Sequence, residues 1–315
     1  MGQNHKRARG ANKVSIQIFG GMGDVLAITP ALKALKQQEP GRRVVVYFVS
    51  EDHRRLLENN PNIDQYKKVL TAPSWLRRHE LPYRVFRAIQ LRVQNLTDPH
   101  RVRLSVGSMG TYTVYRIKAA HILAQGLDVD LVDDQVEIYL TNEELDRGKK
   151  LASKFTNPII INPTSRSRRN SVWPLARWQQ LIKTFPKLTF IQVGLPDEPL
   201  ITGAVDLRKN NSLRELIALL KYARCYVGMD TFWGHAAAAV KTPGVVLHGD
   251  GHPAVFGHDC HVNLFKNFRC APCMPRLGMS PCPYDVECIK AISVEDVAKA
   301  LMQQLQAGTV SRQDN

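Results

Sequence analysis

Short apolar runs alternate with amphipathic stretches along most of the chain, which is typical of strands and helices that follow one another. Strands are predicted at 14–19, 44–49, 158–162, 188–193, 225–227 and 244–247, and helices at 30–39, 143–154, 178–185, 212–220, 234–240 and 293–304. Continuous apolar strands suit parallel sheets that are covered by helices on both faces. The pattern predicts an α/β fold with doubly wound sheets, whose ligands bind beyond the carboxyl ends of the strands.

The predicted elements form two successive α/β halves, each of ordinary domain size. Residues 1–13 are polar and basic, and we expect them to form a flexible tail. A first Rossmann-like domain is predicted at 14–150. A second is predicted at 151–315, with a cysteine-rich segment at 270–288 and a closing helix. The boundary near residue 150 follows from a charged helix that leads into a new strand.

The stretch 226–249 combines a strand, a tight turn, an alanine-rich helix and a second strand. Asp230 and Thr231 stand where a helix N-cap belongs. A helix that opens beyond a parallel strand presents unpaired N–H groups and a partial positive charge, which favour a phosphate. Two interpretations stay open at this position: an anion-binding site, or a helix cap without a ligand.

The formal charge of +15 and the pI near 9.7 indicate anionic partners, such as nucleic acid, a phosphorylated glycan or an acidic membrane surface. Nucleic acid is not the expected partner, because no recognised nucleic-acid module occurs. A transmembrane helix is not expected either, because no run of about 18 apolar residues occurs. Glycines and an aspartate interrupt the apolar segment after the basic start, so a signal peptide is not expected. We therefore expect a cytoplasmic protein with reduced or metal-bound cysteines.

The region 73–118 is basic and carries scattered aromatic residues. Nine lysines and arginines stand against Glu80 and Asp98, so the region has a strong positive charge. One interpretation is a solvated charged face of helices. The other is an acceptor groove or a membrane-facing patch, because arginine and amphipathic aromatic side chains suit a lipid-linked, phosphorylated substrate.

A glycine-rich loop follows the first predicted strand and ends at Asp24. Gly20, Gly21 and Gly23 permit a tight turn, but their spacing is not the dinucleotide fingerprint. Asp24 lies at the crevice end of the first domain, where a carboxylate can act chemically. On local grounds, capping of the next helix explains the same residue.

A second polar loop follows the strand at 158–162 and carries hydroxyl groups and arginines. Thr164 and Ser165 offer hydroxyls and loop N–H groups to a diphosphate, and either Arg168 or Arg169 offers a cation. A solvated basic loop is the alternative. Glu198 stands in a turn after the strand at 188–193, where a plain turn is also an adequate explanation.

Two clusters of residues that can bind metal stand near the C-terminus. The first comprises His248, His252, His258 and His261 with Asp250 and Cys260, and it fits no common zinc spacing. The second comprises Cys270, Cys273, Cys282 and Cys288, which begin with a CxxC pair. Four thiolates this close in sequence can hold zinc or iron in a structural site. Reduced cysteines packed beside prolines are the alternative.

Two motifs resemble those of glycosyltransferase family 9, the heptosyltransferase type. DTFWGHAAAAVKTPGVVLHG is similar to the donor-site signature of this family, with matches at Asp230, Thr231, His235, Pro243 and Gly249. GGMGDVLAITPALKALKQQEP is similar to the N-terminal motif, with Asp24 in the place of the general base and Gly21 and Gly23 in the acceptor-side loop. Phe232 stands where the signature usually has glycine, and Trp173 with its proline stands later than in the related segment.

The resemblance implies a GT-B fold, in which two Rossmann-like doubly wound domains face each other across a cleft. It implies an inverting transfer of heptose from ADP-heptose to a hydroxyl of a lipopolysaccharide core, another glycan or a protein, without a catalytic cofactor. Donor-binding roles are implied for Thr164, Ser165, Arg168, Glu198, Asp230, Thr231, His235 and Gly249. A related branch that binds iron through cysteines adds to the metal hypothesis for the cysteine cluster.

The implied partners are a nucleotide-sugar donor and an anionic glycan, glycolipid or protein acceptor, with peripheral association at the inner face of the inner membrane. A rival interpretation is a non-catalytic anion-binding protein, for nucleic acid or acidic polysaccharide, that keeps the fold. Phe232 and the displaced Trp173 segment are the features that support this rival.

Overall fold

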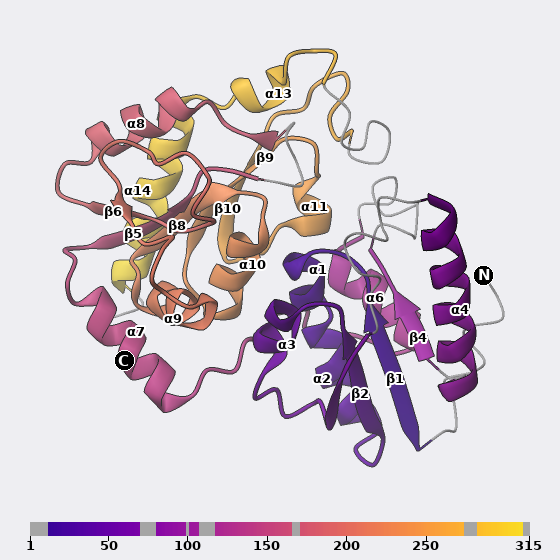
Figure 1. Ribbon diagram of the computed structural model, residues 1–315. Coiled ribbons are helices and arrows are strands. Elements are labelled where there is room, and N and C mark those ends of the chain that lie inside the picture. The colour runs from indigo at the N-terminus through magenta and orange to yellow at the C-terminus, as the bar shows by residue number, and fades with distance from the viewer. Residues whose placement is uncertain are drawn as a thin grey trace. The chain divides into compact units, whose positions relative to one another are not determined.

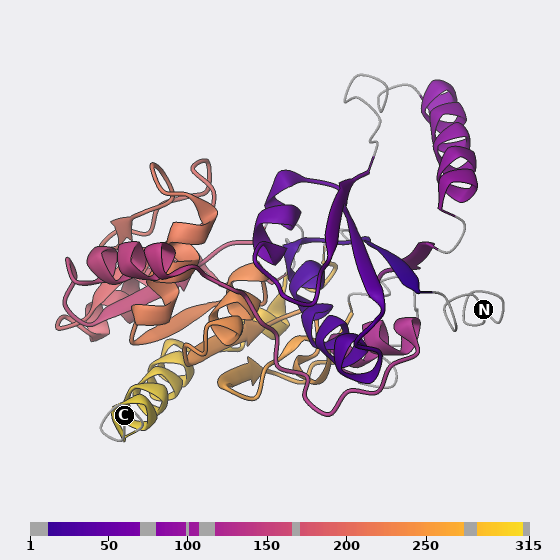
Figure 2. The same cartoon turned by 90° about the horizontal axis from the view of Figure 1, so that it is seen from below.

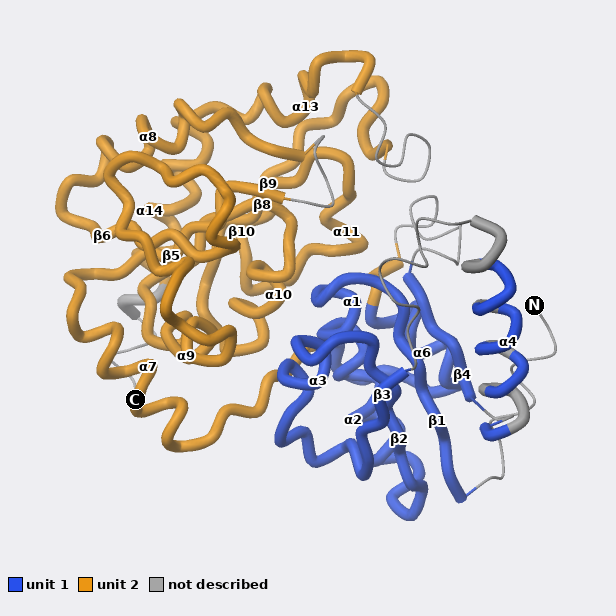
Figure 3. Tube along the Cα trace, in the orientation of Figure 1, with its two compact units in different colours: residues 1–108, 120–134 blue, residues 109–119, 135–315 orange. Residues whose placement is uncertain are grey.

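The computed structural model describes residues 12–69, 80–98, 101–106, 117–165, 171–273 and 282–310 (Figure 1). The chain divides into two compact units (Figure 3). Unit 1 comprises residues 1–108 and 120–134, and unit 2 comprises residues 109–119 and 135–315. Among the described helices, none is long and apolar enough to cross a membrane.

Unit 1 is built on a parallel sheet with the strand order β3-β2-β1-β4. Its elements are β1 (Lys13–Ile18), α1 (Met22–Ala27), α2 (Thr29–Gln38), β2 (Arg43–Phe48), α3 (Glu51–Leu57), β3 (Gln65–Lys68), α4 (Glu80–Thr97), β4 (Arg101–Leu104) and α6 (Ala119–Leu127). The chain runs from β1 outward to β3 and then returns to place β4 on the other side of β1. The strand order therefore reverses between β1 and β4, and a gap beyond such a switch point is where ligands bind in open α/β sheets.

Both faces of the unit 1 sheet are buried, but they differ in chemistry. Ile16 and Val46 pair on one face, which is mostly apolar, while Gln17 and Tyr47 pair on the opposite face. The order in which strands are added to the sheet reverses between β3 and β4. Right-handed crossovers therefore place α2 and α3 on one face of the sheet and α4 on the other. Tyr47 lines a pocket together with residues of α4, so α4 covers the more polar face.

Unit 2 is built on a parallel sheet with the strand order β10-β9-β8-β5-β6-β7. Its elements are α7 (Asn142–Ala152), β5 (Pro158–Asn162), α8 (Leu175–Thr184), β6 (Thr189–Gln192), β7 (Val205–Asp206), α9 (Leu213–Tyr222), β8 (Cys225–Met229), α10 (Phe232–Ala239), β9 (Gly244–His248), α11 (Pro253–Phe256), β10 (His261–Phe265), α13 (Glu287–Lys290) and α14 (Val294–Val310). The strand order reverses between β5 and β8, so the switch point of unit 2 lies at the ends of these two strands.

Helices cover both faces of the unit 2 sheet. Helices α8 and α14 pack together on one face, and α9 and α10 lie on the other, as Figures 1 and 2 show. The core under α8 contains Trp173 and Trp178, whose rings meet edge to face with centroids 5.2 Å apart. Trp173 is fully buried, and its Nε1 donates to the carbonyl of Ile292 at 2.8 Å. The tryptophan that stands later than in the related family segment is therefore part of the core.

The division between the units lies at residues 134–135, earlier than the boundary near residue 150 that the sequence predicts. Helix α7, which the prediction assigned to the first domain, packs on α9 of unit 2. Gly148 lies so close to Ala218 that a Cβ atom at Gly148 would stand 2.5 Å from the Ala218 carbonyl carbon. This close packing makes α7 part of unit 2. Its charged sequence alone is typical of a linker between domains.

Candidate functional site

Three neighbouring strands of unit 2 are joined at their carboxyl ends by the side chain of Asn162. Asn162 is the last residue of β5, and its Nδ2 donates to the carbonyl of Val193, which follows β6, at 3.2 Å. Its Oδ1 accepts from the hydroxyl of Thr231, which follows β8, at 2.8 Å. This second bond spans the gap between β5 and β8. At the switch point, Asn162 and Thr231 therefore form a hydrogen-bonded polar group, which is called the seat below.

The N-terminus of α10 opens at this seat. Thr231 is the N-cap residue in extended conformation; its side chain makes no capping bond, and its hydroxyl donates to Asn162. The N-terminus of α10 therefore has no cap from Thr231, and a helix N-terminus favours an anion. Phe232 is the first helical residue, buried and packed edge to face on Trp233. A glycine is not needed here, because the backbone is helical.

Thr164 and Ser165 follow β5 at the same edge of the sheet. The hydroxyl of Thr164 is buried, and no described residue forms a hydrogen bond with it. A buried hydroxyl without a partner costs free energy, so this atom is suited to a polar ligand or water. Ser165 is half-buried. Arg168 and Arg169 lie outside the described residues.

Asp230, the residue before Thr231, is buried inside unit 2. Its side chain is 4% exposed, and its Oδ2 lies 3.5 Å from Nδ1 of His248, the last residue of β9. The other ring nitrogen of His248 lies 3.0 Å from Oδ1 of Asn263. Asn263 donates through Nδ2 to the carbonyls of His258 and His261, which leaves Oδ1 as an acceptor, so Nε2 of His248 carries a proton. Asp230 is therefore buried between the ends of β8 and β9 and does not face solvent.

A hollow behind Asp230 and Thr231 is closed by three histidines. Nδ1 of His235 lies 2.8 Å from Nε2 of His258, and Nε2 of His261 donates to the carbonyl of Gly234 at 3.0 Å. Burial lowers the pKa of His258 well below 6.5, and burial also lowers the pKa of His261. Both rings are therefore neutral near pH 7, and the His258 ring orients that of His235 through one hydrogen bond.

Glu198 closes a turn after β6. Its Oε2 accepts from the N–H of Leu195 at 3.1 Å and fills the space beside Gly194, which has a φ of +137°. A Cβ atom at Gly194 would stand 2.2 Å from this oxygen. Glu198 thus makes the turn contact that the sequence offered as an alternative, at the strand next to β5.

Asp24 makes the same contact in unit 1. The loop after β1 is shorter than the sequence predicts, because α1 begins at Met22 and places Asp24 in its first turn. Oδ2 of Asp24 accepts from the N–H of Gly21 at 2.8 Å, and a Cβ atom at Gly20, where φ is +137°, would stand 2.2 Å from it. Gly23 lies within α1. Because Asp24 follows β1 at the switch point of unit 1, its half-buried carboxylate is both a cap and a group at the ligand-binding edge.

The cysteine cluster belongs to unit 2. Among the described residues there is no group of three or more His, Cys, Asp or Glu side chains that could hold a metal ion. Burial, followed by nearby Asp250 and the other cysteines, raises the pKa of Cys273 to about 11. Burial also raises the pKa of the Cys288 thiol. The two thiols are therefore protonated near pH 7, and a metal ion that bound them would displace their protons.

Along unit 2, the predicted residues follow four adjacent strands at one edge. Gly249 follows β9, Asp230 and Thr231 follow β8, the Thr164 loop follows β5, and Glu198 follows β6. Two further residues of this region had no assigned role in the sequence. Asn162 gave no signal beyond ending a strand, and His258 appeared only in a histidine group without a zinc spacing. Their roles depend on contacts across 69 and 23 sequence positions.

Comparisons with known proteins identify the family of the chain. The sequence profile of glycosyltransferase family 9 (heptosyltransferase) matches residues 108–279. The chain is 24% identical over 280 residues to lipopolysaccharide heptosyltransferase 3 of Escherichia coli (strain K12), covering 72% of this chain and 79% of that protein.

Solved structures share the two-unit architecture. A family 9 glycosyl transferase from Veillonella parvula DSM 2008 matches with a TM-score of 0.68 and 16% identity, covering 97% of this chain and 100% of that one. E. coli heptosyltransferase WaaC with ADP-2-deoxy-2-fluoro heptose matches with a TM-score of 0.61 and 14% identity, covering 92% and 99%. The iron-containing dodecameric glycosyltransferase TibC from enterotoxigenic E. coli H10407 matches with a TM-score of 0.65 and 16% identity, covering 94% and 76%.

Proposed function

The chain belongs to glycosyltransferase family 9 and is a glycosyltransferase with the expected GT-B fold; from this premise we propose that it transfers heptose from ADP-heptose, with inversion. The family membership favours this function over a non-catalytic anion-binding protein. Phe232 no longer supports that rival, because its position is helical. Trp173 no longer supports it either, because the residue belongs to the core.

The observation that carries the donor assignment is the polar seat at the switch point of unit 2. The Thr231 hydroxyl donates to Asn162 and does not cap α10, which supports binding of a phosphate at the N-terminus of this helix. The buried Thr164 hydroxyl offers a further donor at the adjacent strand end. In this proposal the pyrophosphate of ADP-heptose binds between the ends of β5 and β8.

The departure of ADP is favoured by the same groups. Negative charge develops on the leaving diphosphate in the transition state, and pre-oriented donors stabilise charge that develops during a reaction. Helix N–H groups and the sequence-assigned cation Arg168 supply this stabilisation, so the proposed reaction uses no cofactor. Glu198 and Gly249 flank the seat at the next strands, where the nucleoside and the sugar are proposed to lie.

Asp24 is proposed as the general base. A sugar hydroxyl is a weak nucleophile, and removal of its proton during attack contributes roughly 10²–10⁴-fold to the rate. The Asp24 carboxylate lies at the carboxyl edge of the unit 1 sheet, and its bond to Gly21 fixes its orientation. That bond uses Oδ2 and lies on the exposed side of the turn.

The acceptor is proposed to bind on unit 1 and to be an anionic glycan, glycolipid or protein presented on the cytoplasmic side of the inner membrane. The positive charge of the whole chain suits such an acceptor. Closure of the two units on each other would exclude water and align the hydroxyl with the anomeric carbon.

Thermal unfolding with a panel of sugar nucleotides tests the donor proposal. At about 100 times its dissociation constant, a ligand that binds only the folded state stabilises it by about 2.7 kcal/mol. We expect ADP-heptose and ADP to raise the melting temperature more than UDP sugars do. Stabilisation by polyanions alone, with a steep loss in salt, would instead favour an anion-binding protein.

Thr231→Val sharpens this test, because it removes the bond to Asn162 while keeping the shape of the side chain. The unpaired Asn162 acceptor should lower the free energy of unfolding by about 1–3 kcal/mol. We expect donor affinity to fall roughly tenfold as well, because the N-terminus of α10 is then no longer held in place for the pyrophosphate. Thr184→Val is the matched control, because the Thr184 hydroxyl bonds only to the Gln180 carbonyl at the exposed end of α8. Equal donor affinity in both variants would contradict the assignment of the seat.

A further inference from the structure

A histidine pair lies one turn inside α10, on the side of the helix that carries Thr231. Thr231 and His235 are four positions apart, a spacing that places two residues on the same side of a helix. Both line the hollow that the histidines close. Nδ1 of His235 lies 2.8 Å from Nε2 of His258, and the two rings are nearly perpendicular, with centroids 5.0 Å apart. The pair is therefore close to the helix end where the diphosphate is proposed to bind.

The hydrogen bond between the two rings limits the number of protons that the pair can hold. One hydrogen lies between Nδ1 of His235 and Nε2 of His258, so one of these atoms donates and the other accepts. A second positive charge would place hydrogens on both atoms and break the bond. While the bond persists, the pair is therefore neutral or carries one positive charge.

The surroundings of His258 oppose a positive charge on its own ring. Four described groups act on it through their charge, namely His235, His261, Lys118 and Asp230. Burial is the strongest influence, and together with the two histidines and Lys118 it lowers the pKa of His258 well below 6.5. Of the four groups, Asp230 acts in the opposite direction. His258 is therefore neutral near pH 7 and suited to accept a hydrogen bond from a charged neighbour.

Two of these neighbours are held by partners of their own. Nε2 of His261 donates to the carbonyl of Gly234 at 3.0 Å, and burial lowers the pKa of His261. Nζ of Lys118 lies 3.1 Å from both carboxylate oxygens of Asp259, which partly balance its charge. His261 is thus neutral and fixed by another bond, so His258 is the ring that accepts from His235.

We propose that the pair of His235 and His258 takes up one proton when the donor diphosphate binds at the N-terminus of α10. The negative charges of the diphosphate favour a positive charge close by. The proton comes from solvent and goes to His235, which then carries hydrogens on both ring nitrogens. His258 accepts from the charged ring and holds it in place, so His258 is a positioning residue. The pair acts only if the donor binds at α10, so this step rests on the proposed function.

Calorimetric titration with ADP-heptose, in buffers that differ in ionisation enthalpy, measures the number of protons taken up. ADP-heptose is better suited than ADP, because both ends of its pyrophosphate are esterified and no phosphate group titrates near neutral pH. We expect uptake that approaches one proton per chain near pH 7. The dissociation constant should then rise by up to about tenfold per pH unit, between the pKa of the free pair and the higher pKa of the bound pair.

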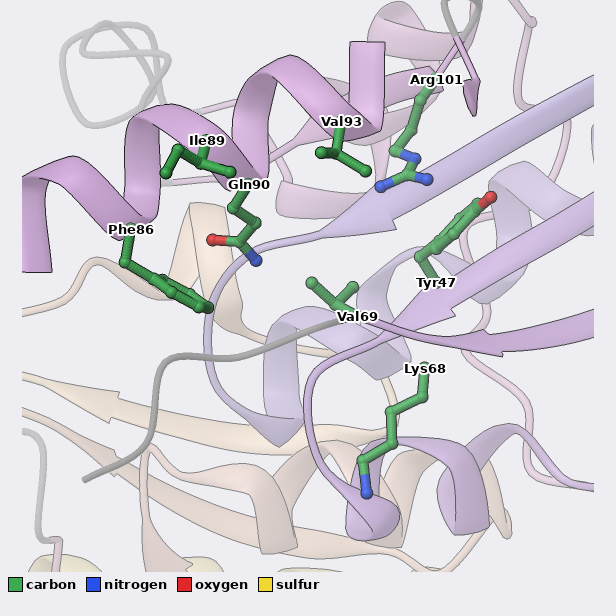
Figure 4. Close-up of a pocket in the computed structure, with 8 residues that line it drawn as sticks. All are labelled: Tyr47, Lys68, Val69, Phe86, Ile89, Gln90, Val93 and Arg101. Atoms are coloured by element: carbon green, nitrogen blue, oxygen red, sulfur yellow. The ribbon is translucent and has the colours of Figure 1, made fainter. Parts of the chain in front are cut away.

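The proton count also tests where the ligand binds. A pocket of about 220 Å³ lies between α4 and the strands of unit 1, and none of the described residues that line it is a histidine (Figure 4). Those residues are Tyr47, Lys68, Val69, Phe86, Ile89, Gln90, Val93 and Arg101. Tyrosine, lysine and arginine titrate far above pH 7. A ligand that bound in that pocket would therefore take up no proton.

His258→Phe removes the acceptor and keeps a ring of similar size in the buried position. We expect proton uptake to fall, and donor affinity to drop about tenfold near pH 6 but little near pH 8, where the pair is neutral in either case. His258→Gln is the conservative variant, because Oε1 of a glutamine can accept from the charged His235 ring. It should restore most of the uptake that His258→Phe loses.

His121→Gln is the matched control. His121 lies on α6 of unit 1, where its Nε2 is 3.6 Å from Oδ2 of Asp134. Its replacement should leave both the proton uptake and the donor affinity unchanged. Circular dichroism and a melting temperature close to that of the unchanged chain establish that each variant is folded.

Each result has a distinct meaning. Absence of ADP-heptose binding by the unchanged chain would contradict the donor site and, with it, the role of the pair. Binding without proton uptake, or uptake that His258→Phe leaves as large, would overturn the role of the pair and leave the donor site standing. A loss of affinity in His258→Phe that is equal at every pH would overturn it as well, because His258 would then act only through packing.

Discussion

A carboxylate that closes a glycine turn occurs once in each unit, in the same local geometry. Asp24 fills the space beside Gly20, and Glu198 fills the space beside Gly194; both glycines have a φ of +137°. Each carboxylate accepts from the N–H group that follows its glycine. Each turn also follows a strand, β1 in one unit and β6 in the other. At the residue scale, these turns fix where a charged group stands at the edge of each sheet.

Replacement of Gly20 by alanine tests the turn in unit 1. Its φ of +137° is strained for alanine, and the added Cβ would stand 2.2 Å from Oδ2 of Asp24. We expect Gly20→Ala to lower the free energy of unfolding by about 1–3 kcal/mol. Urea unfolding measures this loss. Gly41→Ala is the matched control, because a Cβ at Gly41 meets no atom within 4 Å, and equal stability of the two variants would contradict the geometry.

At the element scale, α7 and α9 are joined by one buried ion pair. Arg214 donates through Nε to Oε1 of Glu144 at 2.5 Å, and the two side chains are 7% and 12% exposed. Arg214 also donates to the carbonyl of Tyr139 at 2.6 Å, and Glu144 caps α7 by accepting from the N–H of Thr141. The pair therefore joins the segment before β5 to the body of unit 2.

The stability of unit 2 should depend on pH through Glu144. The hydrogen bond from Arg214 lowers the pKa of Glu144 below 4.5, so its contribution is present above pH 4.5 and is lost as the pH falls through the folded pKa. At neutral pH, Glu144→Gln should cost about 3 kcal/mol, because it leaves a buried arginine unpaired. The variant should also flatten the pH dependence of urea unfolding below pH 4.5.

Arg147→Gln provides the control on the same pair of helices. Arg147 lies 3.9 Å from Glu215, and its side chain is 55% exposed, so the loss should stay below about 1 kcal/mol. A loss in Glu144→Gln no larger than this, with an unchanged pH profile, would contradict the role of the buried pair.

The strands and the helix at the donor seat were predictable because their signals are local. Continuous apolar runs marked β5 and β8, and Thr231 marked the start of α10. The start of α1 was missed, because glycines in its first turn read as a loop. The side-chain network was not predictable. The bonds of Asn162 and His258 join residues distant in sequence, and periodicity carries no information on such pairs.

The whole molecule repeats one arrangement twice: a parallel sheet whose strand order reverses, with polar groups at the reversal. Unit 1 offers a carboxylate there, and unit 2 offers the N-terminus of α10 and the buried hydroxyl of Thr164. One edge thus suits a proton acceptor and the other suits a diphosphate. This division of chemistry between the units, on a chain of net charge +15, is what the proposed transfer of a sugar requires.

The transfer rate of Asp24→Asn with ADP-heptose, measured alongside donor binding, tests this account most directly. An asparagine Oδ1 can keep the bond from the Gly21 N–H, so the turn should survive while the base is lost. We predict unchanged melting temperature and donor affinity with a transfer rate reduced roughly 10²–10⁴-fold. A transfer rate close to that of the unchanged enzyme would contradict the assignment of Asp24 as the base.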